Sequence, residues 1–280
     1  MKLAYFPGCK IPFYLKDYGI SFEAIMRKLD IELIKLPFNC CGYPARSKNF
    51  EVSVLSSIRN YALARKYDLD IITPCKCCFG QFKHATYWYD HNKDLKKKID
   101  SLLNREGLFW DGSTQIDHML SFFYNKFGIN EMAKRIQKKL PGKKIAVQYG
   151  CHALRPFSIT GFDNPYAPKM FEALLDVTGV IPVEWSKSTE CCGSPAFDSN
   201  PKLSFKILQN KIKTASEAGA DYICTACTHC QMQYETEQFK KQSNHHHPTP
   251  LLFTQILGAA LGINKNKLSE KGDLTPILFE

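Results

Sequence analysis

The chain contains no apolar run long enough to cross a membrane as a helix. About 18 consecutive apolar residues would be needed, and none is found among its 280 residues. The N-terminal stretch is interrupted by Pro7 and Gly8 and soon reaches Lys16 and Asp17, which argues against a secretory signal. We therefore expect a cytoplasmic protein, in which thiols stay reduced and serve metal binding or redox catalysis instead of disulfides.

Two cofactor motifs are also missing. No C-x2-C-x2-C-x3-C-P run is present, so the sequence has no ordinary ferredoxin centre through which electrons pass. No G-x-G-x-x-G follows an expected strand, so no flavin or nicotinamide site is visible. Electrons used by this protein must therefore come from a partner.

The charge is unbalanced, since 37 Lys and Arg against 27 Asp and Glu give +10. Such an excess often marks proteins that bind nucleic acids or membrane surfaces. Here the cluster of lysines within residues 93–98 has the pattern of a solvated helix face. Metal-bound thiolates would offset more of the charge, and we expect no nucleic-acid partner.

Cysteine, by contrast, is abundant, and ten of the twelve cysteines form one pattern twice. Each copy has a single cysteine, an adjacent pair followed by glycine, and a closing C-x-x-C. The first set is Cys9, Cys40, Cys41, Cys75 and Cys78, and the second set is Cys151, Cys191, Cys192, Cys227 and Cys230. Corresponding cysteines are offset by 142, 151 or 152 residues. The near-constant offset indicates a duplicated domain with one metal site in each copy.

The residues between the cysteines predict an α/β fold in each half. Short apolar runs, typical of buried strands, lead into each cysteine position and alternate with helical segments. Strands are expected within residues 3–9, 32–36, 70–73, 145–151, 180–183 and 221–224. Helices are expected at residues 15–29, 49–67, 115–129, 165–178, 201–218 and 250–263, with another beginning at each C-x-x-C.

This alternation predicts two pseudo-repeated domains, each a small, mostly parallel sheet flanked by helices. The turn at 141–144 divides them into residues 1–141 and 142–280. Because ligands of open α/β sheets lie at the carboxyl ends of the strands, we expect the five cysteines of each half to converge there. Residues 264–280 are polar and weakly patterned, and we expect a tail that docks on a partner.

Three kinds of cysteine chemistry fit parts of this pattern. A structural zinc ion takes four ligands, but adjacent cysteines are awkward around one small tetrahedral ion. Thiolates also bind iron–sulfur clusters, in which neighbouring cysteines reach different irons. Dithiol exchange would use the C-x-x-C alone and leaves the other cysteines unexplained. The spacing favours iron–sulfur over zinc and dithiol exchange without excluding them.

At these motifs the chain strongly resembles the CCG-domain proteins, specifically the B subunits of heterodisulfide reductases. The gaps are 30, 33 and 2 residues in the first half and 39, 34 and 2 in the second, the first being at the short edge of the family range. The resemblance covers nearly the full length. It implies that each set of five cysteines holds a noncubane [4Fe–4S] cluster and that a substrate disulfide is cleaved between the two. It also implies two partners in the same complex, the iron–sulfur C subunit and the flavin-containing A subunit.

Cleavage of a disulfide also needs a source of protons. Candidate acids are His152, beside Cys151, and His229, inside the second C-x-x-C; a capping or exposed histidine is the plain alternative for His229. Four cations lie beside the motifs and could attract an anionic substrate or balance cluster charge: Lys10, Arg46, Lys76 and Arg155. Cys77 and Cys224 fall outside the repeat and are expected to be buried spectator thiols, or else extra ligands.

The chain also departs from the family after the second cysteine pair. Methanogen-type proteins tend to be glycine-rich there, whereas this chain reads Ser-Pro-Ala-Phe-Asp-Ser at residues 194–199. A different pocket and substrate are therefore plausible, including carrier-bound sulfur in the heterodisulfide reductase-like complexes of sulfur oxidisers. The alternative from another class is a non-catalytic protein of such a complex that transfers electrons or binds zinc.

Overall fold

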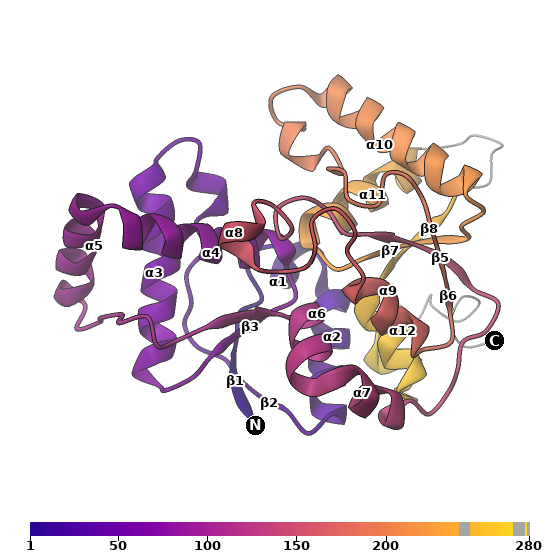
Figure 1. Ribbon diagram of the computed structural model, residues 1–280, viewed down its shortest axis with the longest axis horizontal. Coiled ribbons are helices and arrows are strands. Elements are labelled where there is room, and N and C mark those ends of the chain that lie inside the picture. Colours follow the sequence, from indigo (N-terminus) through magenta and orange to yellow (C-terminus); the bar gives the residue numbers. More distant parts are fainter. Residues whose placement is uncertain (241–246, 271–277, 279–280) are drawn as a thin grey trace.

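Two parallel four-stranded sheets, each flanked by helices, form the scaffold (Figure 1). The computed structural model describes residues 1–240, 247–270 and 278. The first sheet has the strand order β2-β1-β3-β4 and the second has the equivalent order β6-β5-β7-β8. The duplicated α/β fold predicted from the sequence is confirmed.

The strands are short and largely buried. The first sheet consists of β1 (Lys2–Tyr5), β2 (Glu32–Ile34), β3 (Ile71–Thr73) and β4 (Ile116–His118). The second consists of β5 (Lys144–Gln148), β6 (Ile181–Val183), β7 (Tyr222–Thr225) and β8 (Thr249–Leu252). All strand pairs are parallel; Ala4 in β1 is paired with Ile34 and Ile71. The carboxyl ends of each sheet therefore lie along one edge.

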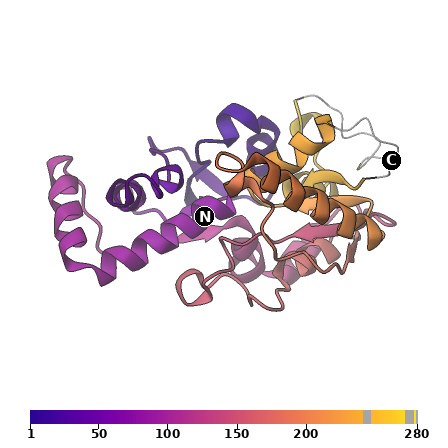
Figure 2. The ribbon, with the colours of Figure 1, turned by 90° about the horizontal axis from the view of Figure 1, so that it is seen from above.

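Helices connect the strands and cover the sheets. Those of the first half are α1 (Ile11–Tyr14), α2 (Lys16–Lys28), α3 (Phe50–Lys66), α4 (Lys76–His91), α5 (Lys93–Arg105), α6 (Met119–Ser121) and α7 (Ile129–Arg135), with a π-helix at Phe122–Gly128. Those of the second half are α8 (Phe157–Thr160), α9 (Met170–Asp176), α10 (Pro201–Glu217), α11 (Thr228–Lys240) and α12 (Phe253–Ala260). Short 3-10 turns lie at Tyr43–Ala45, Ser194–Ala196 and Lys265–Lys267. Seen from above, α4 and α5 extend from the first half away from the second (Figure 2).

The helix that follows the cysteine pair starts in the same way in both halves. Asn49 precedes α3, and its side chain accepts a hydrogen bond from the amide of Val52 at 3.1 Å. Asn200 precedes α10 and accepts from Leu203 at 3.0 Å. Asparagine is favoured at this position because it satisfies an amide that the helix leaves unpaired.

The halves are packed tightly against each other. Helix α2 contacts α12 across the boundary, where the hydroxyls of Ser21 and Thr254 lie 2.7 Å apart, both buried. Helix α4 contacts α8 and α11 of the second half. Within the described residues, no helix has both the length and the apolarity needed to span a bilayer.

Three local predictions were wrong. The segments 115–129 and 250–263 were expected to be wholly helical, but each begins at an edge strand, β4 or β8. The helix expected at 165–178 is shorter, spanning Met170–Asp176, because the Asp163 carboxylate accepts hydrogen bonds from the amides of Lys169 and Met170 and fixes the preceding loop.

The beginning of the tail packs on this chain. Leu268 is buried, and the Ser269 hydroxyl and the Glu270 amide donate hydrogen bonds to Asp17 at 2.6 and 2.8 Å. Most of the remaining tail lies outside the described residues.

Candidate functional site

The ten repeated cysteines lie just beyond the carboxyl ends of the strands, as predicted. Cys9 follows β1, the Cys40–Cys41 pair lies in the loop after β2, and Cys75 precedes the first turn of α4. Cys9 and Cys151 each follow a glycine, which has no side chain and so leaves room for another sulfur atom of the same set. A Cβ on Gly8 would lie 2.9 Å from the Cys78 Sγ, and one on Gly150 would lie 3.6 Å from the Cys230 Sγ.

The thiols of the first set interact with one another in a row. The sulfur atoms of Cys9 and Cys40 are 4.0 Å apart. Hydrogen bonds from the thiols of Cys40 and Cys78 lower the pKa of Cys41 to about 5. The neighbouring thiols of Cys227, Cys77 and Cys78 lower the pKa of Cys75. Cys41 and Cys75 are thus biased toward the thiolate, the form that binds metal, while neighbouring thiols raise the pKa values of Cys9, Cys40 and Cys78.

The second set repeats this row around a cavity. Hydrogen bonds from Cys151 and Cys192 lower the pKa of Cys191, and those from Cys230 contribute most to the lowered pKa of Cys227. The cavity is lined by Tyr43, Lys76, Cys77, Tyr149, Gly150, Cys151, His152, Cys191, Cys192, Pro195, Cys227, His229 and Cys230. All five thiols of the second set thus line one cavity.

The two C-x-x-C segments meet where the halves join. The Cys77 Sγ lies 3.6 Å from the Cys227 Sγ, and the Thr228 hydroxyl lies 3.1 Å from the Cys75 Sγ. His118, at the end of β4, has its Nε2 3.1 Å from the carbonyl oxygens of both Pro74 and Ala226. One imidazole N–H therefore ties together the backbones that precede Cys75 and Cys227.

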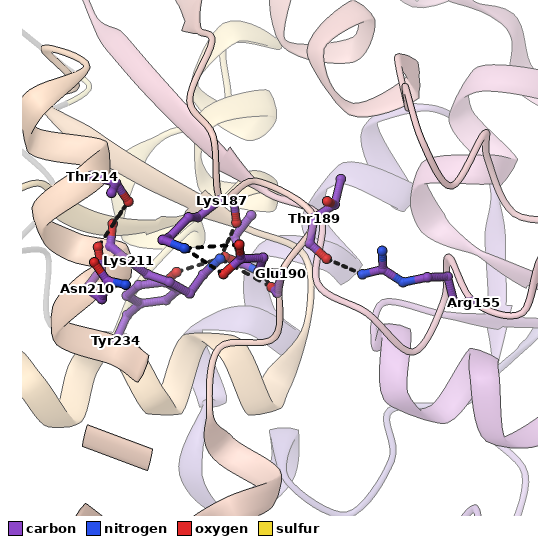
Figure 3. Close-up of polar contacts among 9 residues, drawn as sticks. Arg155, Lys187, Thr189, Glu190, Asn210, Lys211, Thr214 and Tyr234 are labelled. Carbon is purple, nitrogen blue, oxygen red and sulfur yellow. Dashed lines mark hydrogen bonds and ion pairs between the residues drawn. The ribbon is translucent and has the colours of Figure 1, made fainter. Parts of the chain in front are cut away.

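Two buried lysines lie against the second set. Lys76 Nζ donates to the Gln148 carbonyl at 3.3 Å and lies 4.5 Å from the Phe171 ring centroid. Lys211 Nζ donates to the Lys187 carbonyl and, at 3.2 Å, to the Glu190 carbonyl (Figure 3). Burial lowers the pKa of each ammonium to about 8. Both lysines are thus mostly protonated at neutral pH.

Both predicted histidine sites border the cavity. His152 stacks on His84, with ring centroids 5.2 Å apart, and its Nε2 is buried with no hydrogen-bond partner. His229 Nδ1 lies 3.3 Å from the Ser194 hydroxyl. Burial lowers the pKa of His152 to about 4 and also lowers that of His229, so both rings are mostly neutral at neutral pH. The Tyr43 ring contacts both, at centroid distances of 5.0 and 5.5 Å.

The remaining predicted cations have different surroundings. Arg155 donates to the Thr189 carbonyl and so holds the loop before Cys191 (Figure 3). Lys10 lies over the Tyr14 ring at 5.7 Å and counteracts the raised pKa of Cys9. Arg46 contributes to the lowered pKa values of His84 and His152.

The two cysteines outside the repeat differ sharply. Cys224 is fully buried in β7, and burial raises its pKa, which matches a packed spectator thiol. Cys77 lies at the junction of the two sets and also lines the cavity. It has a sulfur neighbour in each set, so it is the better placed of the two to take part in chemistry.

The donor set suits an iron–sulfur group better than a single ion. Five thiols in each half exceed the four ligands of a tetrahedral zinc site. Within residues 1–240, 247–270 and 278, no three His, Cys, Asp or Glu side chains are arranged to hold one metal ion. The sulfurs of the second set surround one cavity instead, and cysteine thiolates are the usual ligands of iron–sulfur clusters.

Comparison with known proteins agrees with this geometry. The family model of the CCG domain, described as a cysteine-rich domain, matches residues 3–83 and 145–235, more than half of the chain. The chain belongs to this family. Both matched segments contain a complete set of five cysteines.

Relatives extend the likeness over nearly the full length. The chain is 27% identical to the B subunit of the ferredoxin/F420H2-dependent CoB-CoM heterodisulfide reductase of Methanosarcina acetivorans, over 95% of this chain and 91% of that one. It is 29% identical to the 8-methylmenaquinol:fumarate reductase membrane anchor subunit of Wolinella succinogenes, over 95% and 94%. The predicted resemblance to the B subunits of heterodisulfide reductases is confirmed, and together with the domain it supports a redox subunit of that type.

A solved structure shares the fold. A hypothetical protein from Helicobacter pylori superposes with a TM-score of 0.77 at 17% identity, over 95% of this chain. The present chain spans only half of that protein's length.

Several residues of the site escaped sequence reasoning. His118 was assigned to a helix, so its place at a strand end was missed. The sequence around Tyr43 gave no signal that this residue belongs to the site. Lys211 gave no signal either, because it stands in an ordinary helical sequence.

Proposed function

We propose that this chain is the catalytic subunit of a heterodisulfide reductase-type complex, which cleaves or forms a disulfide with electrons exchanged through partner subunits. The observation that carries the proposal is the meeting of two five-thiol sets at their C-x-x-C segments, with the second set facing a cavity. All ten repeated cysteines would serve as ligands of two noncubane [4Fe–4S] clusters. A protein that depends on free thiols belongs in a reducing compartment, and we assign it to the cytoplasm.

Disulfide reduction consumes two electrons and two protons and yields two thiols. When bound, the two clusters would supply the electrons one at a time. The protein's own residues would organise the rest of the reaction. Cys77 and Tyr43, which border the second set, would contact the substrate sulfurs.

Proton delivery is assigned to the two histidines that border this cavity. The unpartnered Nε2 of His152 is free to hydrogen-bond with a sulfur placed there. His229 would be oriented through its contact with Ser194. Because both rings are mostly neutral at neutral pH, each would take up a proton only transiently before passing it to a product thiolate.

Partners would meet the open edge of the first set. Cys9 is exposed there and lies beside a groove that includes Cys40, Phe38 and Phe13. The iron–sulfur C subunit would deliver electrons received from the flavin-containing A subunit. In a sulfur-oxidising version of such a complex the substrate would be carrier-bound sulfur and the direction would be oxidative; residues 194–199 beside the second set are where its pocket would differ.

A second function, electron transfer without disulfide chemistry, is favoured by one relative. The Wolinella protein belongs to a quinol:fumarate reductase by name. If this chain worked in the same way, its two sites would pass electrons and bind no disulfide or thiol.

Electron paramagnetic resonance of the reduced, anaerobically purified protein separates the two functions. We expect candidate disulfides or their product thiols to change the cluster signal, because the product sulfur would lie among the site residues. Glutathione disulfide, lipoamide and coenzyme M disulfides would be compared, with His152→Ala as a variant that alters proton delivery. An unchanged signal with all candidates would support the electron-transfer function instead.

A further inference from the structure

The repeat that relates the two cysteine sets also relates the residues that surround them. An offset of 151, which superposes Cys40–Cys41 on Cys191–Cys192, places Lys211 at the position of Asn60. An offset of 152, which superposes the two C-x-x-C segments, places Thr228 at the position of Lys76. Each pair can therefore be compared as one position in two environments.

Asn60 and Lys211 hold equivalent loops, but the asparagine is neutral and the lysine is positively charged. Asn60 is fully buried on α3, and its amide nitrogen donates to the carbonyls of Asn39 and Cys40 at 3.2 and 3.3 Å. Lys211 is fully buried on α10 and donates to the carbonyls of Lys187 and Glu190 (Figure 3). Both hold the loop that leads into a cysteine pair. Only the second half does so with a cation.

Lys76 and Thr228 cross between the halves. Each belongs to one C-x-x-C, is 2% exposed, and points at the other half. Thr228 brings a neutral hydroxyl to Cys75 of the first set, at 3.1 Å. Lys76 brings an ammonium into the second half, where it lies among Gln148, Tyr149 and Phe171. The exchange is unequal, and the second half again receives the cation.

Both cations lie against the second set. Lys76 lines the cavity that all five thiols of the second set also line, and Lys211 is hydrogen-bonded to the carbonyl of Glu190, the residue before Cys191. The nearby carboxyl of Glu172 faces Lys76 but has a raised pKa, caused mainly by burial, and is hydrogen-bonded to Tyr149. At the first set, the corresponding cation is Lys10 beside the exposed Cys9, where water screens its charge.

We infer that Lys76 and Lys211 are tuning residues that give the second site the higher reduction potential, so that electrons shared between the two sites reside mainly there. Adding an electron to a thiolate-bound centre adds negative charge, and a buried cation stabilises that reduced state more strongly than a solvated one. The inference rests on the proposed function, because it concerns iron–sulfur clusters at both sites. It assigns an order to them: the open first site exchanges electrons with a partner, and the second site accumulates them beside the cavity.

Single-site variants allow each potential to be measured by itself. Cys41→Ala would remove the first cluster and Cys192→Ala the second, and iron analysis of each protein would confirm that one cluster is left. Potentiometric titration with dithionite, followed by electron paramagnetic resonance, should give a higher midpoint potential for the second site. Equal potentials, or a higher one at the first site, would overturn the inference. Failure of either site to bind iron and sulfide would instead contradict the proposed function.

The role of Lys211 is tested by replacing it with asparagine, the residue at the equivalent position of the first half. In the Cys41→Ala background, Lys211→Asn should lower the midpoint potential of the second site by about 59 mV. For a one-electron step, this equals about a tenfold change in the equilibrium constant of reduction. Lys213→Asn is the matched control, since Lys213 is on the same helix but is exposed and paired with Glu217. Lys76→Met should act in the same direction as Lys211→Asn. No shift in either variant, or an equal shift with Lys213→Asn, would contradict a tuning role.

Discussion

The two halves of this chain present similar sulfur sets to different surroundings. The first set reaches the surface at Cys9, beside an open groove that includes the strongly exposed Phe13. The second set lines a cavity to which Tyr43, Lys76 and Cys77 of the first half also contribute. A duplicated domain thus produces one site suited to exchange with a partner and one suited to chemistry on a bound molecule.

The supports beneath both sets are, in contrast, nearly the same. Gln81 donates to the Ser53 hydroxyl at 2.9 Å, and Gln233 donates to the Ser204 hydroxyl at the same distance. Both contacts lie under the glycine that follows a cysteine pair. The difference between the halves therefore comes from the charge and exposure of the groups around the sulfurs, on one common frame.

The largest expected effect comes from removing one ligand from one half. Cys192→Ala should lose about half of the iron while the first site keeps its own, because the frame of each set lies mainly within its own half. Iron and sulfide analysis of the purified variant would measure this. Cys224→Ala, which removes a thiol with no described sulfur contact, is the control and should keep all of the iron. Loss of iron from both halves in Cys192→Ala would contradict two separable sites.

The glycines before Cys9 and Cys151 should respond unequally to the same change. Gly8 and Gly150 have φ of +70° and +75°, so alanine strains both by about 1–2 kcal/mol. At Gly8 the new Cβ would also lie 2.9 Å from the Cys78 Sγ, against 3.6 Å from Cys230 at Gly150. Gly8→Ala should cost about 1–3 kcal/mol more in unfolding free energy, since overpacking adds to strain. Urea denaturation of both variants tests this, and equal losses would contradict the steric difference.

His118 joins the halves, and its removal should weaken that joint. His118→Gln should lower the unfolding free energy by about 1–3 kcal/mol, because two buried carbonyls lose a well-placed donor. Mutation of the equivalent position of the second half, Leu252, removes no such bond.

The same histidine predicts a pH dependence. Burial lowers its pKa to about 3, whereas an unfolded histidine titrates near 6.5. As pH falls from about 6.5 toward 3, the unfolded chain takes up a proton that the native His118 refuses, so stability declines by up to about 1.4 kcal/mol per pH unit from this group. His118→Gln should show a shallower decline between about pH 7 and 5.5 in denaturant titrations. Parallel profiles would show that His118 is not buried in its neutral form.

The smallest effect is expected at the joint between the tail and the first half. Asp17→Ala removes acceptors for Ser269 and Glu270 and should cost about 1 kcal/mol. The loss would appear as a lower midpoint in thermal or urea unfolding. Glu217→Ala, at an exposed ion pair with Lys213, is the control and should change stability less.

The sequence was most informative where a pattern repeated. The spacing of the cysteines and the apolar runs before them predicted three strands in each half and the edge where the sulfurs gather. The fourth strands were missed because Ile116–His118 runs directly into an apolar helix, and because Pro250 lacks the amide expected of a strand. Proline is tolerated there because β8 is an edge strand.

The surroundings of the sulfurs were less predictable. Neither Lys76 nor Thr228 has a sequence signal for crossing into the opposite half; that placement follows only from the packing of α4 and α11. Lys211 stands in an ordinary helical sequence, and only its burial shows that it lies on a cysteine loop. Interactions between the two halves depend on how the halves pack together, and the spacing of residues within one half does not predict this packing.

Metal and sulfide analysis of the wild-type chain, purified without oxygen, tests the central claim most directly. Two [4Fe–4S] clusters predict about eight iron and about eight acid-labile sulfide per chain, with the brown colour of iron–sulfur centres. A colourless protein with about two zinc ions and no sulfide would contradict the account.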